Sequence, residues 1–131
     1  MKIAFITDDG KTISQHFGRA AHYLVVELAN SHPINRELRD KLGHKQFVKE
    51  EEESDHSLGS GIDVASHRKH DSMADAIRDC EVLICGGMGR GAYQSMEIFG
   101  IKPIVTDIMG IDEALQAYLA GDLKDHIEKL H

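Results

Sequence analysis

Tryptophan is absent from the chain, and cysteine and proline are scarce. Two cysteines, Cys80 and Cys85, are too few for a disulfide framework or for the four thiolates of an ordinary iron–sulfur site. No window holds the roughly 18 consecutive apolar residues that a membrane-spanning helix needs. The apolar run at 3–6 is too short for a signal peptide, and no small-residue cleavage site follows it. We therefore expect a cytoplasmic protein that does not bind membranes.

Positive charge is also in short supply. The chain has 15 Lys and Arg against 22 Asp and Glu, which gives a formal net charge of -7. Binding to nucleic acid requires clustered basic side chains, and the basic cluster here is only Arg68-Lys69, so general nucleic-acid binding is disfavoured. Apolar residues make up 41% of the 131 residues, which suits a single globular domain over 1–131. Nine histidines are the one chemical oddity of the composition.

The hydrophobic pattern predicts an α/β domain with a mixed sheet. Apolar runs at 2–7 and 22–28 indicate strands, and 34–39 is a weaker third candidate. We expect these three to form a hairpin or meander. The second half of the chain is expected to hold a helix at 71–80, strands at 82–85 and 101–106, a helix that buries Ala92, Met96 and Phe99, a helix at 111–120, and a short last helix capped by Asp122.

The strand–helix–strand order in the second half implies parallel strands joined by a right-handed crossover. Pro103 lacks a backbone donor, so its strand is expected to lie at an edge of the sheet or to start pairing late. Between 41 and 66 the hydrophobic pattern fails, and four consecutive glutamates occupy 50–53. We interpret 41–66 as a flexible acidic insertion and expect weak hydrogen-exchange protection over 48–66, because so little apolar surface cannot offset chain entropy.

A glycine-rich corner, Gly86-Gly87-Met88-Gly89-Arg90, lies between a predicted strand and a predicted helix. Backbone N–H groups at such a corner attract anions, and Arg90 adds positive charge. Gly87, Gly89 and Ala92 also fit the pattern G-x-G-x-x-A, and Asp107 stands 20 positions after Gly87, as in a dinucleotide site. The corner is therefore either an anion or nucleotide site or a tight turn without a ligand.

Histidines form a second group of candidates. His67 and His70 flank Arg68-Lys69 just before the helix predicted at 71–80, and His16 lies in the loop after the first strand. An imidazole can bind a metal or an anion, although isolated histidines at such places are commonly just exposed. Both interpretations are open at this point.

Convergence of these candidates depends on topology. If the strands at 2–7 and 82–85 lie side by side and parallel, their carboxyl ends meet at one edge of the sheet. Three side chains then converge on one cleft: His16, His70 and Met88. Cys85, at the end of the second strand, is either a further soft ligand or a buried core thiol.

Motifs of common enzymes are missing. The chain has no G-x-S-x-G, P-loop or C-x-x-C motif, so hydrolase and thioredoxin-like activities have no support. Asp8, Asp9 and Asp107 follow predicted strands and suit a magnesium site, but Asp-Asp-Gly is also ordinary turn chemistry, which we favour. We expect a binding protein rather than an enzyme.

Two segments resemble the signatures of a known family. The opening MKIAFITDDGKTISQHFGRAAHYLVVEL is similar to a strand, a loop with S-x-H-F-G-R-A and a second strand. The stretch CEVLICGGMGRGAYQSMEIFGIKPIV is similar to an apolar strand, G-G-M-G, a helix, G-I and a strand. In this order they resemble the dinitrogenase iron–molybdenum cofactor biosynthesis family, which includes NifX and NafY proteins and the C-terminal part of NifB.

The resemblance implies a ribonuclease-H-like fold and a carrier or chaperone for an iron–sulfur or molybdenum-containing cluster, with cluster donor and acceptor proteins as partners. His70 occupies the position of the family's cofactor histidine, with His67 as the fallback, although His70-Asp71-Ser72-Met73 departs from the usual His-Gly-x-Leu. The cofactor-binding candidates are His70, His16, Gly87, Met88, Gly89 and Arg90, and the metal-ligand candidates are His70, His67 and Cys85. The alternatives are a nucleotide- or phosphate-binding domain and an interaction module without a ligand.

Overall fold

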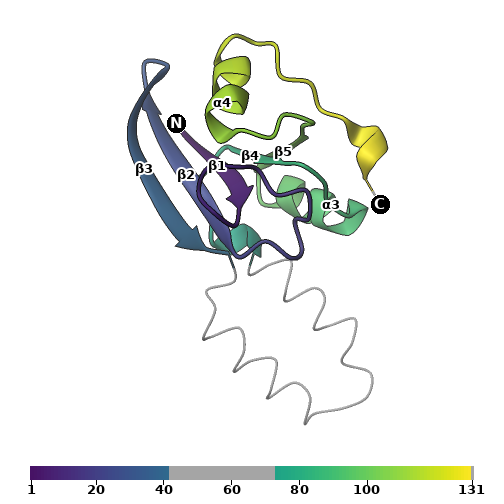
Figure 1. Ribbon diagram of the computed structural model, residues 1–131. Helices are drawn as coiled ribbons and strands as arrows, with labels where there is room; N and C mark the ends of the chain where they lie inside the picture. The colour runs from purple at the N-terminus through teal and green to yellow at the C-terminus, as the bar shows by residue number, and fades with distance from the viewer. Residues whose placement is uncertain (42–72, 131) are drawn as a thin grey trace, which may run out of the picture.

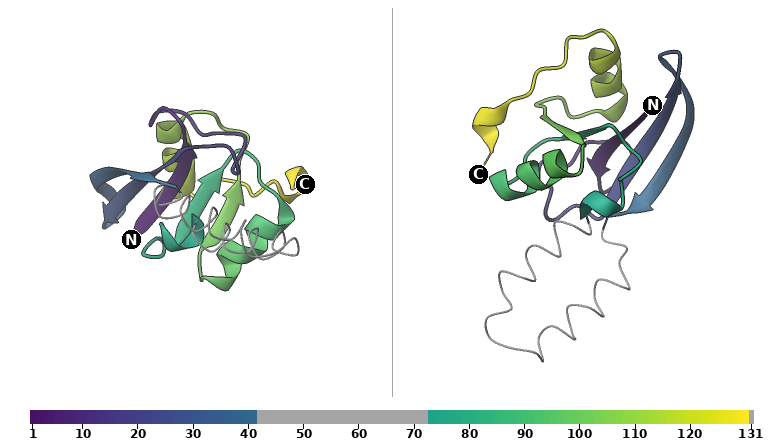
Figure 2. Two further views of the ribbon diagram at one scale, coloured as in Figure 1. Left: turned by 90° about the horizontal axis from the view of Figure 1, so that it is seen from below. Right: turned by 180° about the vertical axis from the view of Figure 1, so that it is seen from behind.

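A computed structural model of the chain describes residues 1–41 and 73–130. Its centre is a five-stranded mixed sheet in the order β3-β2-β1-β4-β5, with helices on both sides (Figures 1 and 2). The elements are β1 (Lys2–Thr7), β2 (His22–Ala29), β3 (His32–Asp40), β4 (Val82–Cys85), α3 (Arg90–Ile98), β5 (Lys102–Val105), α4 (Ile111–Leu119) and a 3₁₀ turn (Ile127–Lys129). In the described ranges no helix has the length and apolar character needed to cross a membrane.

The strand pairings confirm the predicted topology. β1 pairs antiparallel with β2, and β2 pairs antiparallel with β3, which forms a meander. β4 lies parallel to both β1 and β5, and α3 makes the crossover between β4 and β5. β5 is an edge strand, as Pro103 indicated. The mixed α/β sheet expected from the sequence is therefore the fold of the chain.

Burial explains why the central strands are continuous apolar runs. Ile3 to Ile6 of β1 and all of β4 are buried, because helices cover both faces of the sheet there. α3 buries Ala92 and Met96, and α4 buries three residues spaced for one helical face: Ile111, Ala114 and Leu115. These two faces close the core from opposite sides (Figure 1).

Three elements differ from the sequence prediction. β3 is longer than 34–39 because a two-residue turn at Asn30-Ser31, both with positive φ, starts the strand at His32. Helical structure described at 73–75 continues as a tight turn rather than to Cys80, since Ile77 and Cys80 donate to carbonyls three residues back. The predicted burial of Met73, Ile77 and Cys80 is nevertheless correct.

The last helix predicted from Asp122 is reduced to the 3₁₀ turn, because the preceding residues run along β5 instead. The acidic insertion predicted at 41–66 lies outside the described residues except for Lys41, and so does the exchange expectation for 48–66.

The chain after α4 is hydrogen-bonded to the outer edge of β5 at Val105. The backbone N–H of His126 donates to the carbonyl of Val105 at 2.8 Å. The Asp125 carboxylate accepts from the Val105 N–H at 2.9 Å and from the Tyr93 hydroxyl at 2.8 Å. The same hydrogen bond to Asp125 raises the pKa of Tyr93 to about 12. Asp125 therefore ties the C-terminal segment to both β5 and α3.

Asp125→Ala is expected to lower the free energy of unfolding by about 1–3 kcal/mol, because the Val105 N–H and the Tyr93 hydroxyl each lose their acceptor. Urea denaturation measures the effect. Asp122→Ala, at an exposed site of the same segment, is the control and should stay within about 0.5 kcal/mol of the parent protein. Equal stability of the two variants would contradict the role given to Asp125.

Candidate functional site

Three loops gather at the carboxyl ends of the parallel strands. The loop at 8–21 follows β1, the turn at 86–89 follows β4, and the loop at 106–110 follows β5. Backbone hydrogen bonds join the first and third loops: Ile13 N–H donates to Met109 O at 2.7 Å, and Ile111 N–H donates to Lys11 O at 3.0 Å. Ligands commonly bind at this edge of an α/β sheet. Most of the candidates from the sequence that lie within the described residues are found here.

The two signature segments contact each other through their backbones. Gly86 N–H donates to Ser14 O at 2.9 Å, and Phe17 N–H donates to Gly87 O at 3.1 Å. A Cβ added to Gly86 would lie 2.9 Å from Ser14 O, and one added to Gly87 would lie 2.5 Å from Gln15 O. These two glycines are therefore required by the close approach of the loop, and the Gly86 N–H is used within the protein.

The remaining part of the glycine corner is the start of α3. Gly89 is the N-cap residue, with an extended backbone at φ -77 and ψ 156, and its helix has no side-chain cap and no acidic residue in its first turn. Arg90, the first helical residue, is exposed. The N-terminus of α3 thus offers unsatisfied N–H groups, the positive end of the helix dipole and a guanidinium to an anion.

His16 lies beside this corner, as the parallel pairing of β1 and β4 requires. Its N–H donates to Ser14 Oγ at 3.1 Å, and its carbonyl accepts from Arg19 N–H and Ala20 N–H at 3.0 Å each. The next residue, Phe17, is buried and carries the hydrogen bond to Gly87. The backbone of His16 is therefore held firmly while the residue itself stays exposed.

The soft candidates Cys85 and Met88 are core residues in the structure. Met88 is buried, and Cys85 is buried with its Sγ 3.7 Å from Ile104 O. Burial raises the pKa of the Cys85 thiol to about 12, whereas metals bind the thiolate. This agrees with the structural interpretation of Cys85. His67 and His70 lie outside the described residues, so their ligand roles stay predictions.

The acidic residues after β1 make turn contacts. The Asp9 carboxylate accepts from Lys11 N–H and Thr12 N–H at 2.8 Å each, and these hydrogen bonds hold the pKa of Asp9 well below its usual range. Asp8 accepts from Ala21 N–H at 2.9 Å. Asp107 is exposed after β5. Within 1–41 and 73–130, no three His, Cys, Asp or Glu residues form a group able to hold a metal ion.

Lys41 is a residue of this region that the sequence interpretation missed. It is 1% exposed, its Nζ donates to Phe17 O, and the same atom lies 4.8 Å from the centroid of the Phe17 ring. The available signal was the alternation of side chains along β3. It places Lys41 on the same face as Arg39, and Arg39 lies opposite the buried Tyr23 of β2 on that face. Lys41 therefore helps to fix the loop at 8–21, hereafter the signature loop, because it holds the carbonyl of Phe17.

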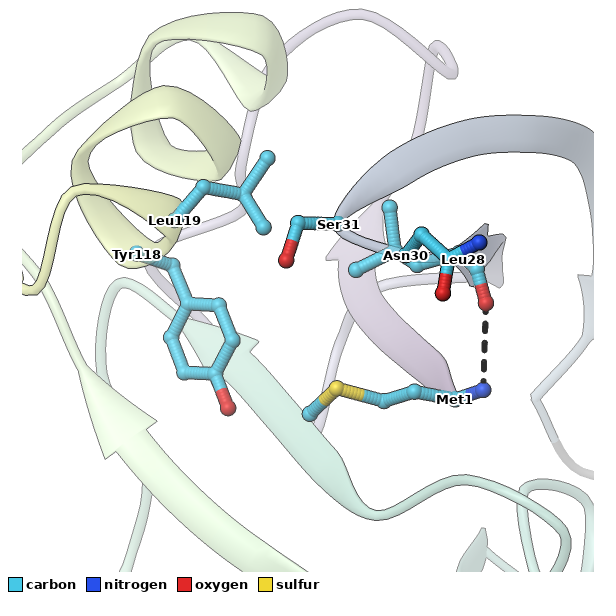
Figure 3. Close-up of a pocket in the computed structure, with 6 residues that line it drawn as sticks. All are labelled: Met1, Leu28, Asn30, Ser31, Tyr118 and Leu119. Carbon is cyan, nitrogen blue, oxygen red and sulfur yellow. Dashed lines mark hydrogen bonds between the residues drawn. The ribbon is translucent and has the colours of Figure 1, made fainter.

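A surface pocket of about 440 Å³ lies elsewhere, between the β2–β3 turn and the end of α4 (Figure 3). Six residues line it: Met1, Leu28, Asn30, Ser31, Tyr118 and Leu119. The terminal ammonium of Met1 donates to Leu28 O there at 3.2 Å. This pocket lies at the opposite end of β1 from the signature loop. None of its lining residues is a cofactor-binding or metal-ligand candidate from the sequence.

Substitutions at two glycines test the close contact between the signature segments. Gly87→Ala is expected to lower the free energy of unfolding by about 1–3 kcal/mol, because its Cβ meets the Gln15 carbonyl. Gly18→Ala is the matched control: a Cβ at Gly18 has no heavy atom within 4 Å, and the φ angle of Gly18 is not positive. It should be neutral or stabilise by up to about 1 kcal/mol in thermal and urea denaturation. Equal destabilisation by both would contradict this geometry.

Comparison with known proteins agrees with the fold. The chain matches the family model described as dinitrogenase iron-molybdenum cofactor over residues 1–121. An uncharacterised protein of Methanocaldococcus jannaschii is 25% identical over 126 residues, which cover 95% of this chain and 90% of the relative. The apo orange protein of Desulfovibrio gigas is similar in structure, with a TM-score of 0.64 and 25% identity, covering 95% of this chain and 91% of that one. A M. jannaschii protein provisionally described as a dinitrogenase has a TM-score of 0.61 and 18% identity, covering 95% and 92%.

Proposed function

Because the chain belongs to the dinitrogenase iron–molybdenum cofactor family, we propose that it carries a metal–sulfur cluster at the carboxyl edge of its sheet and does not itself catalyse a reaction. The cluster is its cargo, received from a donor protein and passed to an acceptor. Family membership supports a role in handling the cofactor or related clusters. The arrangement of the signature loop and the start of α3 supports the finer proposal.

The observation that carries the proposal is the direct contact between the two signature segments. The hydrogen bond from Phe17 to Gly87 joins the residue after the exposed His16 to the glycine corner, two positions before Gly89, where α3 begins without a side-chain cap. An anionic cluster can accept hydrogen bonds from the helix N–H groups while one imidazole binds a metal. A site with few protein ligands also suits a carrier, since the cargo must be released.

A nucleotide or phosphate ligand fits this geometry less well. A phosphate cradle uses the N–H groups of the whole glycine corner, but the Gly86 N–H is taken by Ser14 O and Gly87 is packed against Gln15. The start of α3 is what remains for an anion. Asp107, the candidate ribose ligand, is exposed, and its carboxylate lies 3.7 Å from His126 Nε2.

Gly18 adds an argument from the signature itself. The motif S-x-H-F-G-R-A contains this glycine, yet the structure gives no steric or backbone reason for it, because a Cβ there would stand in open space and φ is not positive. Gly18 is two residues from His16 and exposed. A glycine at this position keeps the surface beside His16 clear, which suits a cargo that covers the loop.

Histidine variants test the ligands. Anaerobic reconstitution with iron, sulfide and molybdate, followed by visible absorption and metal analysis, measures cluster binding. His16→Ala and His70→Ala are each expected to weaken binding at least about tenfold, the loss of a 1.4 kcal/mol contact. Binding should also weaken in acid, since protons compete with the metal for an imidazole nitrogen. His32→Ala, at the exposed start of β3, is the control.

The outcomes separate the possible sites. Equal affinity of the parent protein and His16→Ala would remove the signature loop from the site. A loss confined to His67→Ala would identify His67, three positions before His70, as the ligand. If metal and sulfide fail to bind to any form of the protein while a nucleotide raises its melting temperature, the carrier function is wrong.

Gly18→Val tests the open surface. The variant should keep the melting temperature of the parent protein within a few degrees but bind the reconstituted cluster about tenfold more weakly, because the branched side chain occupies the space beside His16. Ala29→Val, at an exposed position near the opposite end of the sheet, controls for the added bulk. Normal binding by Gly18→Val would show that the cargo does not cover this loop.

A further inference from the structure

Strand β3 is an edge strand of the sheet. Within the described residues it pairs only with β2, and it forms the margin of the sheet farthest from β5 (Figure 1). Arg39 is half-buried and every other residue of the strand is exposed, including Leu38 at 54%. An edge of this kind is a ready template for a further strand.

The hydrogen bonds of β2 show which groups of β3 point outward. Leu28 exchanges backbone hydrogen bonds with Met1, so the even-numbered residues of β2 direct their N–H and C=O groups toward β1. The odd-numbered residues of β2 therefore face β3, and they pair there with Asn35, Glu37 and Arg39. The outward groups of β3 consequently belong to Arg36, Leu38 and Asp40.

The sequence of this stretch is complementary to itself. In an antiparallel pair of two copies centred on Leu38, the two Leu38 side chains face each other, Arg36 faces Asp40, and Glu37 faces Arg39. The same centre matches the outward groups, so about six backbone hydrogen bonds form between the copies. We infer that β3 pairs with β3 of a second copy of this chain in this register, which joins two sheets into one.

The side chains of each copy already lie on suitable faces. Arg36 forms an ion pair with Asp112 of α4, whereas Arg39 contacts Asp79, which lies on the other side of the sheet. Pairing therefore places the contacts of Arg36 and Leu38 on the α4 face and those of Glu37 and Arg39 on the opposite face. Each face then holds two intermolecular charge pairs, and the leucine pair sits at the two-fold axis. These charge pairs compete with pairs inside each copy, which join Arg36 to Asp112, Arg39 to Glu37 and Asp40 to His22.

The extent of pairing is limited at the start of β3. A register shift opposite Glu27 and Leu28 interrupts the strand, and Pro33 lacks an N–H group. The regular stretch 36–40 is thus short, and the interface is at the small end of the range for specific contacts. A reversible dimer follows. The signature loop stays accessible, because β2 and β1 separate β3 from β4.

Cysteine cross-linking tests the register in the full-length chain. In the inferred dimer the two Leu38 Cα atoms are about 5.5 Å apart, within disulfide range, whereas the two Arg36 Cα atoms are about 14 Å apart. Leu38→Cys should form a covalent dimer under mild oxidation at least about tenfold faster than Arg36→Cys. The native cysteines, Cys80 and Cys85, are buried. Faster cross-linking at position 36, or none at either position, would overturn the pairing.

Charge reversal tests the complementarity. Sedimentation of the unmodified protein over a concentration series at 0.15 M salt should show a monomer–dimer equilibrium. Arg36→Glu places a like charge opposite each Asp40 and should weaken association at least about tenfold. Adding Asp40→Arg to it should restore association to within about threefold.

The control is Arg78→Glu, which makes the same change in net charge at an exposed site on the segment that follows residue 73. It should leave the dimerisation constant within about twofold. Far-UV circular dichroism confirms that each variant is folded. A parent protein that stays monomeric at every concentration, or a double variant that fails to recover, would contradict the dimer, and neither result bears on cluster binding.

Discussion

The contact between the signature loop and the glycine corner is the constraint on which the functional edge depends. Two backbones approach so closely that a single methyl group at Gly87 would lie 2.5 Å from a carbonyl oxygen. Such an approach is possible only because β1 and β4 are parallel neighbours that end together. Once it forms, it fixes the backbone beside His16 and leaves the N-terminus of α3 open. Fold and candidate site thus share one set of hydrogen bonds.

Much of the fold was predictable from periodicity. The apolar runs of β1 and β4 and the helical spacing of Ala92 and Met96 reflect burial directly, so their elements were identified. The last helix was predicted wrongly. Leu123 and Ile127 have helical spacing, but Asp125 in the same segment is used to satisfy the edge of β5. A local pattern cannot reveal that a distant strand needs a hydrogen-bonding partner.

The candidate site was predictable as a location more than as a set of ligands. Topology placed His16 and the glycine corner together, since both follow parallel strands. The glycines invited an anion-binding interpretation, but the structure shows that Gly86 and Gly87 serve contact with Ser14 and Gln15. The contact with Ser14 and Gln15 has no signature in the sequence, and the alternation of β3 indicates the face of Lys41 but not its bond to Phe17, because both contacts join residues brought together only by folding.

The unequal edges of the sheet govern how copies of this chain can associate. Asp125 and His126 occupy the hydrogen-bonding groups of Val105, whereas no residue in 1–41 or 73–130 pairs with the outer groups of β3. A sheet with two free margins can add copies without end and grow into a filament. In the inferred pairing through β3, the segment after α4 already engages the outer groups of Val105, so strand addition would stop after a single isologous contact and the assembly would stay finite.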